Sequence, residues 1–585
     1  MAYDLKIRGG TLVDGTGAAP YAGDVGIRGG RIVALGDCPD AAAREIDARG
    51  AIVTPGFVDL HCHYDGQVSW DADMAPSSLH GVTTCVNGNC GVGFAPVRPT
   101  DRERLLKLME GVEDIPGSAL AEGITWDWTT FPEYMDAIDA RPHTIDLAAL
   151  VPHDALRVFV MGDRAIAAER ATDDDIAAMR ALLRASLDAG AAGFSTGRTD
   201  NHRASDGSAT PASEATAREL AGVAGAFEGI SHGVLQAVSD FDMAHGDERF
   251  DPEFDVIEAM AAAAKGRTTS VSLMQRDLAP DQWKKILARC EAATARGTSM
   301  RVQVAPRGIG VILGLETTFH PFIGFPSYLR IAHLPLAERV ALMREPSFKA
   351  RLLAEKSQPV AGDGSPIPPM VDLFLSKLEF LSLKLFRLGE TPDYEPPIER
   401  SLYAEAQSRG VPPLEALYDA MLDRDGHELL YFPIFNYTEF NLDNVRTMLT
   451  HPLALVALSD GGAHVGTVCD ASYASFLLAH WTRDRAEGRL PLEDAVRRLT
   501  GANAAYLGLR DRGTLAVGLR ADLNVIDLPR LRLHAPRLVH DLPAGGRRLL
   551  QGADGYVATV VAGQVIRDAD GLTGARPGRV IRMGR

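Results

Sequence analysis

The middle of the chain alternates short apolar β-forming segments with helical segments, and this alternation restricts the fold more than any other feature. Amphipathic helices are predicted between several of the strands, for example over residues 173–189 and 280–296. The strand candidates are residues 52–54, 82–86, 146–151, 193–195, 233–238, 269–273, 299–304 and 453–458. Eight strand–helix units are the number that a closed parallel barrel requires. We therefore predict an α/β chain built on a (β/α)8 TIM-like barrel.

The two ends of the chain have a different sequence pattern from the middle. Short β-forming segments separated by Gly-Gly and Asp-Gly turns fill the first 50 or so residues and return at 513–527 and 556–566. This pattern predicts a small β-sandwich domain built from both termini, residues 1–56 plus 505–585, beside a barrel of residues 57–504. Apolar helical pieces and Pro-rich turns predict a helical insertion at about 308–427, which is either a lid on the barrel mouth or a homo-oligomer contact.

Composition narrows the class of partner. The net charge of −17 over 585 residues argues against a nucleic acid or an anionic membrane, because either would need a basic face. No window reaches the ~18 uninterrupted apolar residues that a membrane span requires. Six cysteines do not form a disulfide framework, and the N-terminus shows no signal peptide. We expect a cytoplasmic enzyme that acts on a small molecule.

The run Phe57-Val-Asp-Leu-His-Cys-His-Tyr-Asp65 carries two imidazoles at positions i and i+2. On a strand this spacing puts His61 and His63 on the same face, while Cys62 points the other way. Neutral imidazole nitrogen is a preferred ligand of zinc and related divalent ions. The pair therefore predicts a metal site, against the alternative of two surface or core histidines.

Two further segments follow predicted strands and supply metal-binding groups. Cys90 lies in Asn87-Gly-Asn-Cys-Gly-Val-Gly93 after the second strand; its alternative role is that of a small buried apolar residue. Asp460 lies in Ser459-Asp-Gly-Gly-Ala-His-Val-Gly466 after the eighth strand, where a carboxylate can bind metal and accept a proton or simply cap a helix. His464 faces the same mouth or caps its own loop.

These segments and others along the chain resemble the amidohydrolase superfamily, specifically its N-acyl-D-amino-acid deacylase branch. The matching residues are Thr54-Pro-Gly-Phe-Val-Asp-Leu-His-Cys-His-Tyr-Asp-Gly66, His80-Gly-Val-Thr-Thr84, Gly88-Asn-Cys-Gly91, Gly193-Phe-Ser-Thr-Gly197, Ser459-Asp-Gly461, Asp511-Arg-Gly-Thr-Leu515, Ala521-Asp522 and Thr573-Gly-Ala-Arg-Pro-Gly-Arg579. The resemblance covers essentially the whole chain. It implies a (β/α)8 barrel with a flanking β-sandwich, and metal-assisted hydrolysis of an amide-like bond.

The resemblance also implies a metal-ligand set and shows where this chain departs from it. One metal position is implied for His61, His63, Cys90 and Asp460. The family's second position shares the cysteine and adds histidines from strands five and six, but residues 234–238 and 271–275 contain none. We therefore expect one ion, Zn²⁺ or another divalent metal, rather than two. Four ligands would close a zinc shell, so either Asp460 alternates between ligand and proton acceptor or Cys90 lies off the metal.

Substrate recognition departs from the family as well. The family's lysine in strand six is Gln275 here, and its His-Pro-Arg segment after the Ser-Asp-Gly motif is missing. Arg198 and His202, which follow strand four, are candidates to replace those groups, with His464 as a further candidate. His202 has the alternative role of a loop histidine packed under the lid.

The resulting functional expectation is a metal-dependent hydrolase of an amide-type C–N bond, with Asp460 as the acid and base. A lactam, cyclic-amide or ester hydrolase of the same superfamily is an alternative. The loss of two family ligands motivates a second alternative, a catalytically inactive barrel that binds a small molecule. Deamination of a cyclic amidine is less favoured, because it calls for a strand-five histidine and a helper glutamate that the sequence does not identify.

Overall fold

The computed structural model describes residues 2–243, 246–361, 367 and 370–584. Its centre is an eight-stranded sheet in which every neighbouring pair is parallel and the strands follow chain order. The strands are β6 (Phe57–Asp59), β7 (Val82–Asn87), β8 (Asp146–Pro152), β9 (Gly193–Arg198), β10 (Val234–Ser239), β11 (Thr269–Leu273), β12 (Met300–Val304) and β16 (Ala454–Val456). Just beyond β6 and β16, Cys62 forms a parallel bridge with Gly461, so the sheet closes into the predicted barrel.

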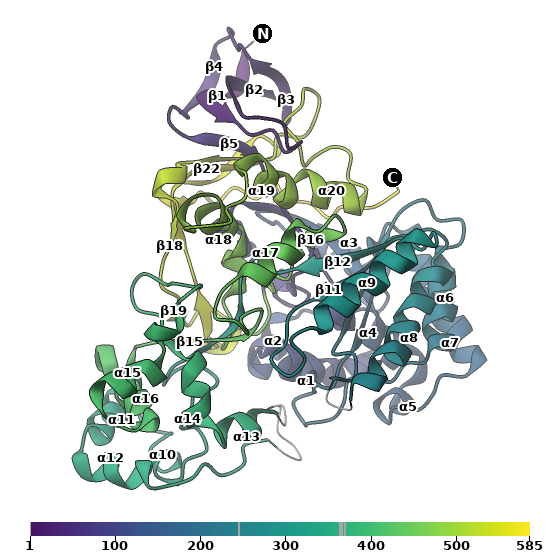
Figure 1. The fold of residues 1–585 in the computed structure, drawn as a ribbon. Coiled ribbons are helices and arrows are strands. Elements are labelled where there is room, and N and C mark those ends of the chain that lie inside the picture. The colour runs from purple at the N-terminus through teal and green to yellow at the C-terminus, as the bar shows by residue number, and fades with distance from the viewer. Residues whose placement is uncertain (1, 244–245, 362–366, 368–369, 585) are drawn as a thin grey trace.

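Helices pack around the barrel, and the two that the sequence predicted are present as α6 and α9 (Figure 1). Helix α6 begins after Thr172, whose hydroxyl forms a capping box with Asp175, and it buries Ile176, Met179 and Leu183 on one face. The helices of the barrel are α1 (Arg102–Glu113), α2 (Gly117–Gly123), α3 (Phe131–Asp139), α4 (His153–Met161), α5 (Asp163–Ile166), α6 (Asp173–Asp188), α7 (Ala217–Ala224), α8 (Phe250–Ala263), α9 (Gln282–Ala295), α17 (Asp443–Thr450), α18 (Tyr473–Phe476), α19 (Leu492–Leu499) and α20 (Gly501–Leu507).

A nine-stranded sheet joins the two ends of the chain, as predicted (Figure 1, top). Its path is β24-β23-β22-β17-β5-β1-β2-β3, and β4 pairs with β1. The strands are β1 (Tyr3–Leu12), β2 (Tyr21–Arg28), β3 (Arg31–Gly36), β4 (Ala42–Asp47), β5 (Ile52–Pro55), β17 (Leu523–Ile526), β22 (Tyr556–Val561), β23 (Gln564–Asp568) and β24 (Gly571–Leu572). The exact domain boundaries stay a prediction.

One predicted barrel strand is wrong. Residues 52–54 belong to β5, which pairs with β1 and β17 in the nine-stranded sheet, and the first barrel strand is β6. Only Gly56 separates β5 from β6. A Cβ atom at Gly56 would lie 2.2 Å from the Thr83 side chain, so the chain passes from one sheet to the other by pressing its backbone against β7.

The segment between β12 and β16 forms a lobe at the opposite end of the molecule from the nine-stranded sheet (Figure 1). Strands β13 (Ile309–Leu313), β15 (Leu430–Phe435) and β14 (Phe386–Arg387) make an antiparallel sheet. The helices are α10 (Pro326–Leu329), α11 (Leu336–Met343), α12 (Pro346–Leu353), α13 (Met370–Leu375), α14 (Leu378–Leu381), α15 (Leu402–Arg409) and α16 (Pro413–Leu422). We call residues 308–435 the insertion lobe. It has a hydrophobic core of its own, which includes Phe322, Met343 and Tyr418.

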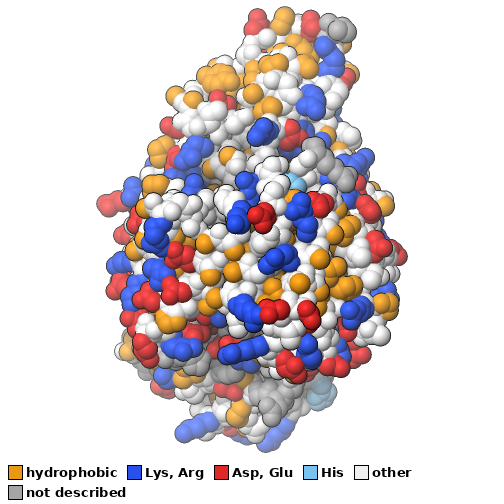
Figure 2. Space-filling model, turned by 90° about the vertical axis from the view of Figure 1, so that its right-hand side faces the viewer, with side chains coloured by type: hydrophobic (Ala, Val, Ile, Leu, Met, Phe, Trp, Pro, Cys, Tyr) orange, Lys and Arg blue, Asp and Glu red, His pale blue; other side chains and the backbone are white. Residues whose placement is uncertain are grey.

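The described residues include no helix that is both long and apolar enough to cross a membrane. On the face that carries the outer helices of the barrel, basic and acidic side chains are interspersed rather than gathered into one patch (Figure 2). Two short β-ribbons, β18 (Arg532–Leu533) with β21 (Ala553–Asp554) and β19 (Arg537–Val539) with β20 (Arg548–Leu550), complete the fold. All six cysteines are buried and unpaired.

Candidate metal centre

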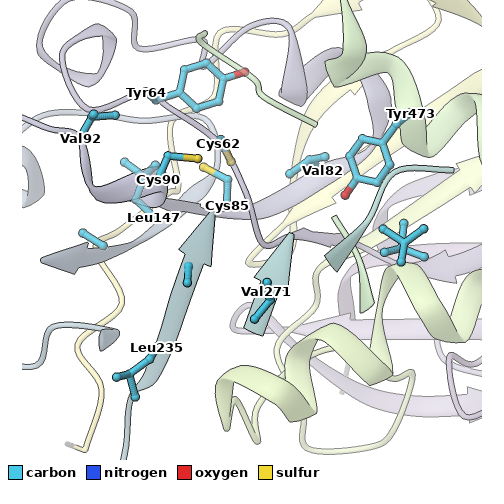
Figure 3. Close-up of a cluster of buried hydrophobic side chains, with 14 of the residues drawn as sticks. Cys62, Tyr64, Val82, Cys85, Cys90, Val92, Leu147, Leu235, Val271 and Tyr473 are labelled. Atoms are coloured by element: carbon cyan, nitrogen blue, oxygen red, sulfur yellow. The ribbon is translucent and has the colours of Figure 1, made fainter. Parts of the chain in front are cut away.

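The two histidines of the His-x-His motif emerge just after β6 at the carboxyl end of the barrel, where barrel enzymes place their active sites. Both rings are buried, and their centroids lie 5.2 Å apart. Cys62 between them is fully buried and packs with Cys85 in the hydrophobic core, as Figure 3 shows. The structure therefore gives His61 and His63 one side of the chain and Cys62 the other, as the i, i+2 spacing predicts.

Cys90 reaches the histidines because the turn after β7 is unusually tight. Its backbone is left-handed, with φ 56°. A Cβ atom at Gly88 would lie 2.1 Å from the Leu150 carbonyl oxygen, so this turn accepts no larger residue there. The Cys90 N–H donates to the Gln236 Oε1 at 2.9 Å, and its Sγ lies 3.2 Å from His61 Nε2. The donor atoms of His61, His63 and Cys90 all lie within 4.8 Å of one another.

Asp460 lies next to this cluster and comes from the segment after β16, the last strand of the barrel. Its N–H donates to the His61 carbonyl at 3.1 Å, and its Oδ1 lies 3.5 Å from His61 Nε2 and 3.9 Å from His63 Nε2. Burial, followed by the charges of Asp470 and Asp59, raises the pKa of Asp460 to about 8. The structure thus gathers three of the predicted ligands into one cluster and places Asp460 beside its two imidazoles, although His61 and Asp460 are far apart in sequence.

The second nitrogen of each imidazole faces a polar side chain, but only that of His61 is hydrogen-bonded. His61 Nδ1 lies 2.7 Å from Gln303 Oε1 on β12, and Gln303 donates its own Nε2–H to Ser270 at 3.0 Å. His63 Nδ1 lies 3.1 Å from Glu113 Oε1 at the end of α1, but no hydrogen bond joins these two atoms. Both rings therefore present Nε2 to Asp460. Such partners commonly set the tautomer and orientation of a metal-binding histidine.

The electrostatics of the cluster suit a divalent cation. Burial lowers the pKa of His61 to about 4 and that of His63 further, so both imidazoles are neutral at pH 7. Burial and the charges of Asp460 and Asp65 raise the pKa of Glu113 well above its usual value, and neither of its oxygens has a hydrogen-bond partner among the described residues. Neutral imidazoles beside concentrated, uncompensated acidic groups are a donor set that a cation would stabilise. The residues fit the metal that the sequence predicts.

The described residues contain no second metal-binding cluster. In strand β10, the Gln236 side chain accepts a hydrogen bond from the Cys90 backbone, and Val238 lines the neighbouring cavity. Ser272 of β11 and Met274, just after that strand, line the same cavity. None of these four side chains is an imidazole or a carboxylate.

Residues 44–567 match the amidohydrolase family. The chain belongs to this family. It is 28% identical to a D-aminoacylase of Alcaligenes xylosoxydans xylosoxydans over 583 residues, 99% of this chain and 97% of the relative. It is also 28% identical to an N-acyl-D-aspartate deacylase of the same organism, over 99% of this chain and 95% of the relative. A solved D-aminoacylase structure, described by the functional role of its binuclear metal centre with one-metal activation and second-metal attenuation, superposes with a TM-score of 0.64 at 26% identity, covering 99% of this chain and 100% of that chain.

Of the three substrate-binding residues predicted for this amidohydrolase, His202 and His464 line the cavity beside the cluster and Arg198 does not. The Arg198 guanidinium is buried and directed at α8, where it forms a two-pronged ion pair with Glu253, and it also donates to the Ala215 carbonyl. A substrate carboxylate would have to displace that pair, so the expected role of Arg198 is not supported. Its position at the end of a barrel strand was correct, but its side chain points to the helix layer.

The sequence patterns did not predict that Glu113 and Gln303 would lie beside the two histidines. Gln303 had a usable signal, because it is a polar residue between two valines in a buried strand. Glu113 had none: it ends a helix with charged residues on its solvent face, and only the packing of α1 against the barrel mouth buries it.

A cavity of about 750 Å³ opens beside the cluster and extends into the insertion lobe of this amidohydrolase. Near the cluster it is lined by histidines and acidic groups, among them His202, His464, Glu113 and Asp460. Farther on, every lining residue from β13, β15, α13 and α14 is apolar. The volume is that of a site for a small organic molecule.

Proposed function

We propose that this chain cleaves the amide bond of an N-acyl amino acid with a single zinc ion held by His61, His63, Cys90 and Asp460. As an amidohydrolase it is a metal-dependent hydrolase of amide-type C–N bonds. The observation that carries the proposal is the convergence of these four donors at the mouth of the barrel, next to a cavity of substrate size. The two deacylase relatives support an N-acyl-D-amino acid as the substrate class, and the absence of a second cluster among the described residues supports one ion.

A divalent cation at this position would polarise the amide carbonyl and make a water molecule more acidic. The side chains of the protein would transfer the protons and stabilise the oxyanion. The Asp460 carboxylate is partly exposed to the cavity, so it can take the proton of the attacking water and pass it to the leaving nitrogen. Burial raises the pKa of Asp460 to about 8, and a neighbouring cation would lower it again, so that the carboxylate is ionised and can accept the proton. His202, kept neutral because burial lowers its pKa to about 3, can donate a hydrogen bond to the oxyanion.

The test combines metal analysis with a substrate panel. We expect the purified protein to bind one equivalent of zinc and to hydrolyse N-acetyl-D-amino acids faster than their L-enantiomers, and we expect lactams and esters to be poorer substrates. Asp460→Asn should lower kcat by about 10²- to 10⁴-fold, the usual contribution of a general base. His61→Ala should lose the metal. Full metal content and undiminished turnover in both variants would contradict the proposal. Tight stoichiometric metal without turnover of any amide or ester would favour the inactive binding barrel.

The cellular setting is part of the same proposal. Six buried, unpaired cysteines support a reducing compartment such as the cytoplasm. The lining of the cavity by α13 and α14 supports the lid interpretation of the insertion lobe over that of a homo-oligomer contact.

A further inference from the structure

The apolar part of the cavity is lined by one strand and two short helices of the insertion lobe, β13, α13 and α14, each of which places apolar side chains in it at the spacing of its own backbone. Strand β13 directs Val311 and Leu313 inward at alternate positions. Helix α13 directs Val371, Phe374 and Leu375 inward, at the i, i+3, i+4 spacing of one helix face, and α14 adds Leu378 and Leu381, which are three residues apart. Two unrelated backbone conformations thus present one continuous apolar surface. The apolar lining is therefore specified by the sequence of the insertion lobe.

None of the described residues of β13, β15, α13 and α14 that line the cavity has a polar side chain, and this restricts the kind of ligand that the cavity can bind. Water in a cavity needs about two to four polar partners, and these side chains offer it none. The polar lining comes from elsewhere: from barrel-side residues that include Glu113, His202, Asp460 and His464, from Thr318 at the start of the insertion lobe, and from Arg547 between β19 and β20. A ligand that fills the whole cavity therefore has a reactive polar end and a long apolar remainder.

We propose that this enzyme prefers long-chain fatty N-acyl substrates, with the scissile amide at the cluster and the acyl chain extending between β13 and the α13–α14 pair. This inference rests on the proposed function and adds the substrate class. An acetyl group would leave most of a 750 Å³ cavity without contacts. Each methylene buried on the apolar surface should improve kcat/KM about fourfold. If only half of the eight methylenes that separate a decanoyl from an acetyl group are buried, the gain is still at least about a hundredfold.

The experiment measures kcat/KM for the N-acetyl, N-hexanoyl and N-decanoyl derivatives of one D-amino acid, below the micelle concentration of the longest. A matched pair of variants on α14 tests the route of the chain. Leu381→Glu places a charge on the cavity wall, whereas Phe380→Glu changes the preceding residue, which is 68% exposed and does not line the cavity. We expect Leu381→Glu to lower the decanoyl-to-acetyl ratio of kcat/KM at least about tenfold, the cost of burying a charge on an apolar wall, and Phe380→Glu to leave that ratio unchanged.

A second readout does not depend on turnover. Decanoate, the acyl product, should bind the zinc-loaded protein far more tightly than acetate in calorimetry, and Leu381→Glu should abolish the difference. If Leu381→Glu does not fold, Val311→Phe fills the same space from β13 and should have the same effect. Hydrolysis of N-acetyl substrates at least as fast as of N-decanoyl substrates, or equal effects of the two glutamate variants, would overturn the inference alone. If no amide is hydrolysed at any chain length, the proposed function fails, and decanoate binding still decides whether the cavity takes an acyl chain.

Discussion

Gln303→Leu should weaken metal binding without touching a metal ligand. The Gln303 amide oxygen is the acceptor for His61 Nδ1 at 2.7 Å, and both residues are almost fully buried, so no water can replace it. Removing the acceptor lets the imidazole rotate and change tautomer. Losing such a partner typically costs 10- to 100-fold in metal affinity, about 1.4–2.7 kcal/mol. The metal-free protein should also lose about 1–3 kcal/mol of unfolding free energy, because a buried N–H is left unpaired.

The assay is zinc affinity, measured by competition with a chromophoric chelator, together with urea unfolding of the metal-free protein. Gln303→Glu is the matched control: it keeps an acceptor at the same place and should hold zinc at least as tightly as the wild-type chain. If Gln303→Leu and Gln303→Glu bind zinc equally well, the hydrogen bond does not orient His61 and the reasoning fails.

Three further outcomes can be checked. Arg198→Ala should cost about 3–5 kcal/mol in urea unfolding, because the buried Glu253 loses its partner, and it should leave KM unchanged; a raised KM with normal stability would restore its substrate role. Burial lowers the pKa of His80 to about 3, so below about pH 6.5 the unfolded state binds a proton that the folded state does not. The free energy of unfolding therefore falls as the pH drops, by up to about 1.4 kcal/mol per pH unit. His80→Gln should flatten this slope in unfolding curves measured at pH 7, 6 and 5. The pKa of Glu113 is raised, so its contribution is lost as pH rises above its unfolded value, and metal-free Glu113→Gln should gain stability over the wild-type chain at pH 8 but not at pH 5.

The parts of the fold that depend on local periodicity were predictable from sequence. The helix over 173–188 and the strand over 269–273 carry their pattern and their end signals within a few residues. The assignment of residues 52–54 to the barrel failed for a non-local reason. Strands β5 and β6 are both short and β-forming with only Gly56 between them, and the close approach of Gly56 to Thr83 marks where the chain changes sheets. A sequence pattern does not contain that contact.

The candidate site divides in the same way. His61 and His63 were predictable because their geometry is set by one strand, and Cys90 and Asp460 because each follows a strand whose end must lie at the mouth. The direction of Arg198 was not predictable, since it depends on whether the last residue of β9 faces the mouth or α8. Glu113 is a still harder case, because its burial depends on where a helix packs after a long loop.

The hydrogen bonds that close the barrel between its first and last strands determine when the site can form during biosynthesis. His63 N–H donates to the Gly461 carbonyl at 2.7 Å, and Asp460 N–H donates to that of His61. His61 and His63 therefore leave the ribosome about 400 residues before the segment that fixes them, a wait of roughly 20–80 s at ~5–20 residues per second. During that interval the nascent chain carries a His-Cys-His sequence with no folded pocket around it. If these residues hold a metal ion, as we propose, the complete site exists only after the last barrel strand has docked, and the ion can be held there only from that point on.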